Sequence, residues 1–292
     1  MVVLENDVVR VQIKEEGAEV TEFFHKENRL DFMWNGDPAY WGRVSPVLFP
    51  IVGRLKDDHY SIDGQDYTLT QHGFLRDCTF ELVEKHETAA RFQISSDGRF
   101  LDVYPYEFEV MIDYKLTDRK LEVRWKVLNK DTDTMYFSIG AHPAFKVPLQ
   151  DGENISDYFI KIQPSKQEVT EYYLDQSLLH VKGTVNELST FPLSAGMFAN
   201  DALIYSNIDQ MTIASKKNPH QIQVDFKGFP FVGIWSKYNE DDKSIAPFLC
   251  IEPWYGVADT YDTIGDFKTK LGINRLEQGD VFQASYSITI TC

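Results

Sequence analysis

Hydrophobic and polar residues alternate along much of this chain of 292 residues. The clearest alternating segments are Val8–Lys14, Phe108–Lys115, Leu121–Leu128 and Gln221–Phe226. Successive side chains of a β-strand point to opposite faces of a sheet, so each segment predicts a strand with one buried face. Because such strands recur with turn signals between them, the pattern indicates a β-sandwich or a β-barrel.

Turn chemistry indicates the same fold class. In Tyr60–Leu69 the pair Asp63-Gly64 separates two alternating arms and supplies the positive φ angles of a type I′ turn, which predicts a tight hairpin. Helical signals are weak: Asp259–Leu271 and Glu171–His180 each predict a turn or two. The absence of strand–helix–strand alternation argues against a doubly wound parallel fold. We therefore predict an all-β chain that forms one domain over residues 1–292.

Amino-acid composition limits the cellular compartment and the classes of binding partner that we expect. The chain has 29 Lys and Arg against 45 Asp and Glu, a net charge of −16, so it repels the phosphate backbone of nucleic acids. The N-terminus shows no basic segment followed by an apolar core, and no run of eighteen apolar residues occurs, so we expect neither a signal peptide nor a membrane span. Three scattered cysteines, Cys78, Cys250 and Cys292, are too few for a disulfide framework or a zinc site, which favours a reducing, cytoplasmic setting.

Four segments interrupt the alternation and bring ionisable residues beside glycine, proline and aromatic side chains. They are Ser45–Leu55, Gln71–Asp77, Ser138–Phe145 and Ile251–Asp259. Strand ends and loops are where site residues concentrate, so these segments are the candidate sources of chemistry.

A histidine and a glutamate from two of these segments form a candidate acid–base pair. His142 precedes a proline, which places it at a strand end or turn; on its own it fits a structural histidine better than a catalytic one. Glu252 interrupts the apolar run Phe248–Gly256, where a carboxylate needs partners or a raised pKa. An ion pair with Arg54 or Arg76 is the structural alternative for Glu252.

Three further residues are candidates for binding a ligand. His72 precedes a glycine and either lines a pocket or caps a turn. Arg54 and Arg76 each offer a planar fork of donors that suits sugar hydroxyls, carboxylates or phosphates. Each arginine equally fits the neutralisation of a nearby acid such as Asp77.

Other chemistries lack their sequence patterns. The chain contains no H-x-H or H-E-x-x-H, no G-x-S-x-G, no Walker loop and no G-x-G-x-x-G. We therefore predict no metal and no nucleotide cofactor.

Taken in order, the motifs FPIVGRL, QHGFLRD, GAHPAF and IEPWYG resemble those of the aldose 1-epimerase (galactose mutarotase-like) superfamily, in particular its LacX-like branch. The resemblance covers nearly the whole chain. It implies a large antiparallel β-sandwich, the galactose mutarotase-like supersandwich, with a sugar site in an open cleft. It also implies an isomerase of carbohydrate metabolism that interconverts the α and β anomers of a hexose without a cofactor.

The resemblance assigns roles to individual residues. It implies that His142 is the general acid at the ring oxygen of the sugar and that Glu252 is the general base at the anomeric hydroxyl. It further implies a set of substrate-binding residues. Asp201 equally fits a turn residue before a strand, and Trp254 equally fits the core. The implied substrate-binding residues are Arg54, His72, Arg76, Asp201 and Trp254.

The substrate is where this chain departs from the galactose-specific enzymes. Glu252 is followed by Pro-Trp where those enzymes carry a polar pair, and their asparagine-rich segment near the first arginine is absent. The segment HGFLR is similar to the HGFAR-type motif of hexose-6-phosphate 1-epimerases, whose arginines hold the phosphate. The net charge of −16 and the acid beside Arg76 argue against a dianion, so we predict that a neutral hexose is the better substrate.

Alternative functions remain open at this point. A hexose-6-phosphate 1-epimerase and a non-catalytic sugar-binding protein on the same fold are the two main alternatives. A glycoside lyase or hydrolase fits less well, because hydrolases usually need two carboxylates at the bond. We expect a small-molecule sugar as the partner, no nucleic acid and no membrane, and we leave assembly into a homodimer open.

Overall fold

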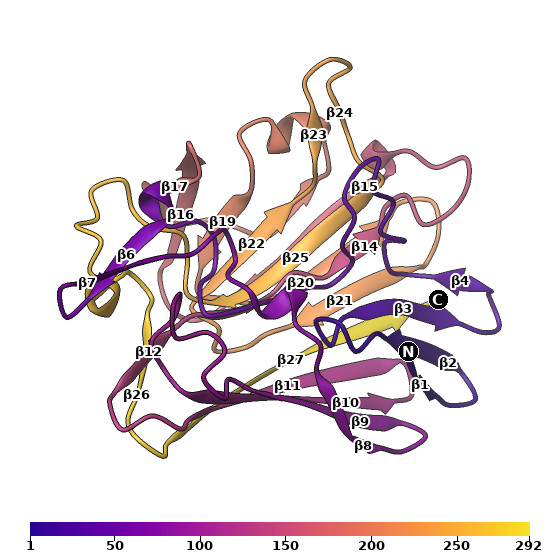
Figure 1. The fold of residues 1–292 in the computed structure, drawn as a ribbon. Helices are drawn as coiled ribbons and strands as arrows, with labels where there is room; N and C mark the ends of the chain where they lie inside the picture. The colour runs from indigo at the N-terminus through magenta and orange to yellow at the C-terminus, as the bar shows by residue number, and fades with distance from the viewer.

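The alternating segments form antiparallel strands in the computed structural model, which describes residues 1–292. Two large sheets face each other, as Figure 1 shows, and the interior between them holds the core. The structure is an all-β sandwich in which the only helical elements are short 3₁₀ turns. These turns are η1 (Lys56–Asp58), η2 (Leu75–Asp77), η3 (Ile155–Asp157), η4 (Ala195–Phe198) and η5 (Phe267–Thr269).

One layer is a sheet of nine strands, all paired antiparallel to their neighbours. Its longest pair, β10 and β11, alternates buried and more exposed residues, as the sequence pattern predicts. In spatial order the strands are β18 (Thr190–Pro192), β15 (Tyr158–Pro164), β20 (Ile208–Ser215), β21 (Gln221–Asp225), β27 (Val281–Thr291), β11 (Lys120–Asn129), β10 (Phe108–Thr117), β9 (Ala89–Ser95) and β8 (Glu81–Lys85).

The opposite layer is a sheet of eight strands that carries the candidate site. Its strand β25 is buried at every residue except Tyr255, because both of its faces are covered. In spatial order the strands are β17 (Leu178–Val185), β16 (Val169–Asp175), β19 (Leu203–Ser206), β22 (Phe231–Trp235), β25 (Phe248–Tyr255), β13 (Ile139–Ala141) and β5 (Val47–Leu48), with β14 (Ala144–Lys146) also paired to β25.

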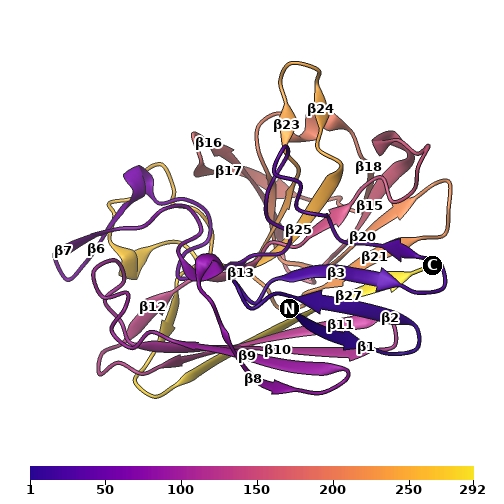
Figure 2. The ribbon, with the colours of Figure 1, turned by 45° about the vertical axis from the view of Figure 1, so that its right-hand side comes forward.

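Smaller sheets complete the fold. The N-terminal sheet lies beside the nine-stranded sheet in both Figure 1 and Figure 2, and the hydroxyl of Tyr114 in β10 donates a hydrogen bond to the carbonyl oxygen of Ala18. The N-terminal strands are β1 (Val2–Glu5), β2 (Val9–Ile13), β3 (Val20–His25) and β4 (Leu30–Asp31). Three two-stranded sheets are β6 (His59–Ile62) with β7 (Gln65–Thr68), β12 (Met135–Phe137) with β26 (Asn274–Leu276), and β23 (Tyr238–Asn239) with β24 (Ser244–Ile245).

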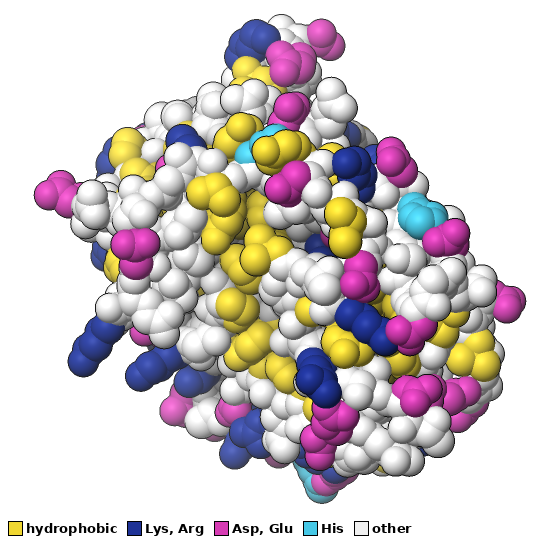
Figure 3. Space-filling view, turned by 90° about the vertical axis from the view of Figure 1, so that its left-hand side faces the viewer, with side chains coloured by type: hydrophobic (Ala, Val, Ile, Leu, Met, Phe, Trp, Pro, Cys, Tyr) yellow, Lys and Arg dark blue, Asp and Glu magenta, His cyan; other side chains and the backbone are white.

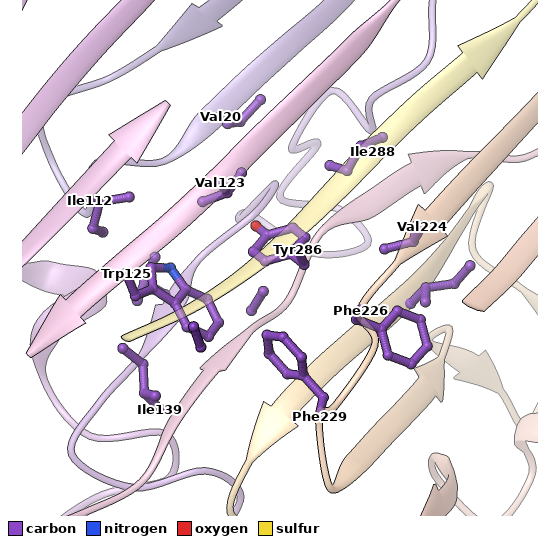
Figure 4. Packing of buried hydrophobic residues seen from close by; sticks show 14 of the residues in the cluster. Val20, Ile112, Val123, Trp125, Ile139, Val224, Phe226, Phe229, Tyr286 and Ile288 are labelled. Atoms are coloured by element: carbon purple, nitrogen blue, oxygen red, sulfur yellow. The ribbon is translucent and has the colours of Figure 1, made fainter. Parts of the chain in front are cut away.

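The main core is one continuous cluster of 66 buried residues between the layers. Figure 4 shows Trp125 and Tyr286 of the nine-stranded sheet pointing into this interior, with Ile139 of the eight-stranded sheet nearby. Burial of each such large apolar side chain contributes roughly 1.5–3 kcal/mol, so the paired apolar faces stabilise the sandwich. Figure 3 shows that exposed hydrophobic side chains also gather in a hollow on the side that carries β6, β7, β16 and β17.

Two local predictions have different outcomes. The Asp63-Gly64 hairpin is confirmed: it joins β6 and β7, and both turn residues have positive φ angles, 52° and 80°. The helical turn predicted in Glu171–His180 is wrong, because this segment forms the hairpin of β16 and β17. Tyr172 and Tyr173 favour a pleated strand, and pairing with β17 overrides the weak helical pattern. In Asp259–Leu271 the only helical element is the 3₁₀ turn η5.

None of the helical elements is long and apolar enough to cross a membrane.

Candidate active site

A cleft of about 420 Å³ brings together residues from all four of the interrupting segments. This volume lies within the usual range for small-molecule sites. Among the predicted site residues, six line the cleft: His72, Arg76, His142, Asp201, Glu252 and Trp254.

The predicted acid–base pair meets in this cleft. His142 follows β13 at its end, where its backbone N–H donates to the carbonyl oxygen of Pro46. Glu252 lies within β25, opposite Gly233 of β22. The His142 Nε2 atom is 3.2 Å from Glu252 Oε2. Two side chains that are far apart in sequence are therefore within hydrogen-bond reach of each other.

Burial sets the protonation of the pair. It raises the pKa of Glu252 well above its usual range, and the negative charge of Asp201 raises it further. Burial likewise lowers the pKa of His142, and the positive charges of Arg76 and Arg43 lower it further. The pair therefore favours a neutral imidazole beside a protonated carboxyl group, with one proton between the two side chains.

Two tryptophans that sequence reasoning missed enclose His142. The ring of Trp41 stacks on the imidazole with 4.7 Å between centroids, and the ring of Trp235 meets it edge-on at 5.6 Å. Both tryptophans line the cleft, and His142 is only 7% exposed. Trp235 is the last residue of β22, so an aromatic residue at a strand end was the available signal. Trp41 lies in a loop whose sequence carries no comparable signal.

His72 is held as a hydrogen-bond donor by the backbone beside it. Its Nδ1 accepts a hydrogen bond from the N–H of Gly53 at 3.1 Å, which leaves the proton of the neutral ring on Nε2. Burial, with the nearby His142 and Arg76, holds the pKa of His72 well below its usual range. The ring meets His142 edge-on at 5.6 Å. His72 therefore presents a neutral N–H at the cleft.

Arg76 lines the cleft and keeps part of its donor capacity free. One terminal nitrogen donates to the carbonyl oxygen of Gln71 at 2.7 Å, while Nε has no hydrogen-bond partner. The adjacent acid, Asp77, lies 3.9 Å from Arg76 but only 2.7 Å from Arg43. Asp77 is therefore bound mainly by Arg43, and the guanidinium of Arg76 remains available to a ligand.

Arg54 does not line the cleft. Its guanidinium forms two hydrogen bonds of 2.9 Å to the carboxylate of Asp58, and its side chain is 46% exposed. An acid four residues further along the chain therefore binds this arginine, and the structure gives no geometric support for its predicted contact with a substrate.

Trp254 forms part of the cleft wall and is itself almost buried, with 5% of its surface exposed. Its indole lies between Gly140 of β13 and Gly233 of β22, where a Cβ would come within 2.6 Å and 2.5 Å of the ring. The two glycines thus form a seat for the indole. Asp201 lines the cleft near Glu252, and one of its oxygens accepts the N–H of Ala202 at 2.9 Å.

Comparisons with known proteins identify the family of this chain. The family model described as aldose 1-epimerase matches residues 1–264. The chain belongs to the aldose 1-epimerase family. Its sequence is 31% identical to the chromosomal protein LacX of Lactococcus lactis subsp. lactis, over 98% of both chains.

Solved structures of family relatives share the fold. A galactose mutarotase related enzyme from Lactobacillus acidophilus is 36% identical, with a TM-score of 0.93 over 99% of this chain and 97% of that chain. A galactose mutarotase-like protein from Lactobacillus casei is 30% identical, with a TM-score of 0.91 over the whole of both chains. The predicted galactose mutarotase-like β-sandwich is therefore confirmed for this aldose 1-epimerase family member.

Proposed function

We propose that this family member is an active aldose 1-epimerase that interconverts the α and β anomers of a free hexose. The observation that carries the proposal is the pair of His142 and Glu252, whose side chains lie 3.2 Å apart in a cleft of small-molecule size. A protein that only binds sugars needs no such buried acid–base pair.

The reaction needs two proton transfers and no redox step. Glu252 takes the proton from the anomeric hydroxyl while His142 gives a proton to the ring oxygen, and the bond between C1 and the ring oxygen breaks. The product is an open-chain aldehyde. Rotation about the C1–C2 bond exposes the other face of the carbonyl group. The two transfers then run backwards, the ring closes, and both side chains recover their starting protonation.

The free cleft supplies the proton that this cycle uses. His142 and Glu252 hold one proton between them, and a bound sugar would separate the two side chains. Burial favours this proton on Glu252, so the cycle requires that binding of the sugar moves the proton to His142 and leaves a carboxylate at Glu252. Each correctly positioned acid or base contributes roughly 10²- to 10⁴-fold in rate.

The remaining cleft residues fit the task of holding a sugar. His72 offers an N–H, Arg76 offers guanidinium donors, and Asp201 offers carboxylate oxygens for hydroxyl groups. Trp41 and Trp235 supply apolar surface beside His142. Sugar sites commonly combine such aromatic faces with a few convergent polar groups.

A hexose-6-phosphate is the second candidate substrate, and Arg76 is the observation that favours it. Arg76 lines the cleft, and Lys237 also lines it. Against this candidate stand the net charge of −16 and the binding of Lys237 Nζ to the carbonyl oxygen of Tyr40. We therefore favour the neutral sugar.

The direct test follows anomer exchange by NMR for free and 6-phosphorylated aldoses. We expect His142→Asn and Glu252→Gln each to lower kcat by roughly 10²-fold or more while the protein stays folded. The double variant should lose far less than the product of the two effects, because the pair acts as a unit. Near-normal exchange in either single variant would refute the role of that residue.

The substrate is decided in the same assay. If kcat/KM for the 6-phosphate exceeds that for the free hexose by more than about tenfold, or ~1.4 kcal/mol, the 6-phosphate is the substrate and the neutral hexose is not. Binding of a sugar without any anomer exchange would instead identify a non-catalytic sugar-binding protein.

A further inference from the structure

A third ligating side chain lies beside the acid–base pair. Cys250 and Glu252 are two residues apart on β25, so both side chains point to the same face of the sheet. One ligand atom each from His142, Cys250 and Glu252 lie within 4.8 Å of one another, and all three residues are buried. The thiol is free of any disulfide.

This set of nitrogen, sulfur and oxygen atoms matches the preferences of Zn²⁺. Zinc binds histidine nitrogen and carboxylate oxygen at about 2.0–2.2 Å and cysteine sulfur at about 2.3 Å, in tetrahedral geometry. Two such nitrogen and oxygen ligands are expected about 3.3 Å apart, and His142 Nε2 and Glu252 Oε2 are 3.2 Å apart. The sulfur needs to be about 3.6 Å from each, and the three ligand atoms lie within 4.8 Å of one another before any ion binds.

Cys250 has no part in the proposed reaction. It does not line the cleft, and it packs instead in a cluster with Trp34, Ala144, Ala246 and Phe248. The thiol therefore lies behind the pair, while the pair itself faces the cleft. An ion bound by all three residues would have its fourth position open toward the cleft, as in zinc sites with three protein ligands.

We propose that His142, Cys250 and Glu252 form a Zn²⁺ site whose occupation excludes the sugar. On binding, the thiol and the carboxyl group each release a proton to water, and the imidazole binds through its neutral nitrogen. The two negative ligands balance the charge of the ion. Zinc then occupies the space between the acid and the base, so that it competes with the sugar. This competition rests on the proposed function, whereas the metal site itself does not.

Cobalt binding tests the site without any need for turnover. We expect the purified full chain to bind one Co²⁺ with a sulfur-to-cobalt absorption band, and Zn²⁺ to displace it. Cys250→Ala should abolish the band and weaken binding at least roughly tenfold. The matched control Cys78→Ala should keep both the absorption band and the affinity. Cys78 directly follows η2, and its thiol donates a hydrogen bond to the carbonyl oxygen of Phe74. Glu252→Gln provides a second ligand variant if Cys250→Ala fails to fold, and it should weaken binding similarly.

The outcomes separate the metal site from the enzymatic proposal. Failure to bind one Co²⁺, or a sulfur band that persists in Cys250→Ala, would overturn the site. In the exchange assay, zinc should raise the apparent KM for the sugar without lowering kcat, and Cys250→Ala should need at least roughly tenfold more zinc for the same effect. Cobalt binding with no exchange on any sugar would leave the metal site standing and refute the proposed function. Exchange that saturating zinc does not inhibit would overturn the competition.

Discussion

The glycine seat of Trp254 allows one substitution to be worked through in detail. In Gly233→Ala, the new Cβ would lie 2.5 Å from Cη2 and 2.6 Å from Cζ2 of the indole. Carbon atoms pack at about 3.5–4.0 Å, so the ring must move by about 1 Å. On its other side the ring already fills the space that a Cβ would take at Gly140, 2.6 Å from Cδ1, and therefore packs against that glycine of β13.

The expected cost follows from this overpacking. Insertion of a methyl group into a closely packed site lowers the free energy of unfolding by roughly 1–3 kcal/mol. Since Trp254 lines the cleft and Glu252 pairs directly with Gly233, we also expect a higher KM for the sugar. Urea unfolding followed by tryptophan fluorescence measures the first effect, and anomer exchange measures the second.

Gly196→Ala is the matched control for this substitution. A Cβ at Gly196 meets no atom within 4 Å, so the free energy of unfolding and the KM should both stay close to the original values. If Gly233→Ala is as stable as Gly196→Ala, the indole does not depend on the glycine seat and the reasoning is wrong.

Two further predictions concern charged residues. Arg76→Ala should lower kcat/KM for the sugar by more than roughly tenfold, or ~1.4 kcal/mol. Arg54→Ala should change kcat/KM by less than about threefold, because Arg54 binds Asp58 outside the cleft. Equal losses of kcat/KM in steady-state exchange measurements would contradict this prediction. Lys270 and Asp259 form a buried ion pair of 2.9 Å, so Lys270→Met should lower the free energy of unfolding by roughly 3–5 kcal/mol, and adding Asp259→Asn should restore part of it in urea unfolding. If the double variant is no more stable than Lys270→Met, an unpaired charge on Asp259 is not the cause of the loss.

Local sequence signals predicted a large part of this fold. The alternating segments became strands, and Asp63-Gly64 became a hairpin, because pleat and turn chemistry act over a few residues. The segment Glu171–His180 was missed because pairing between β16 and β17, which a local pattern does not contain, decided its structure.

The candidate site was predicted unevenly for similar reasons. Chemistry that interrupts a pattern is visible in sequence, so His142 and Glu252 could be selected before their side chains were known to meet. Trp41 and Cys250 reach the same place only through the fold, and neither breaks a local pattern. Arg54 shows the converse: its motif suggests a ligand, but Asp58 lies within reach and binds it.

Strand β25 ties the candidate active site to the global stability of the molecule. Leu249 and Ile251 face the main core, while Glu252 and Trp254 of the same strand face the cleft. Amide groups in a strand covered on both faces exchange with solvent only through large openings of the structure. We therefore expect Glu252, the proposed base, to lie in the slowest-exchanging part of the backbone. Substitutions within β25 should therefore change the free energy of unfolding together with any activity of the site.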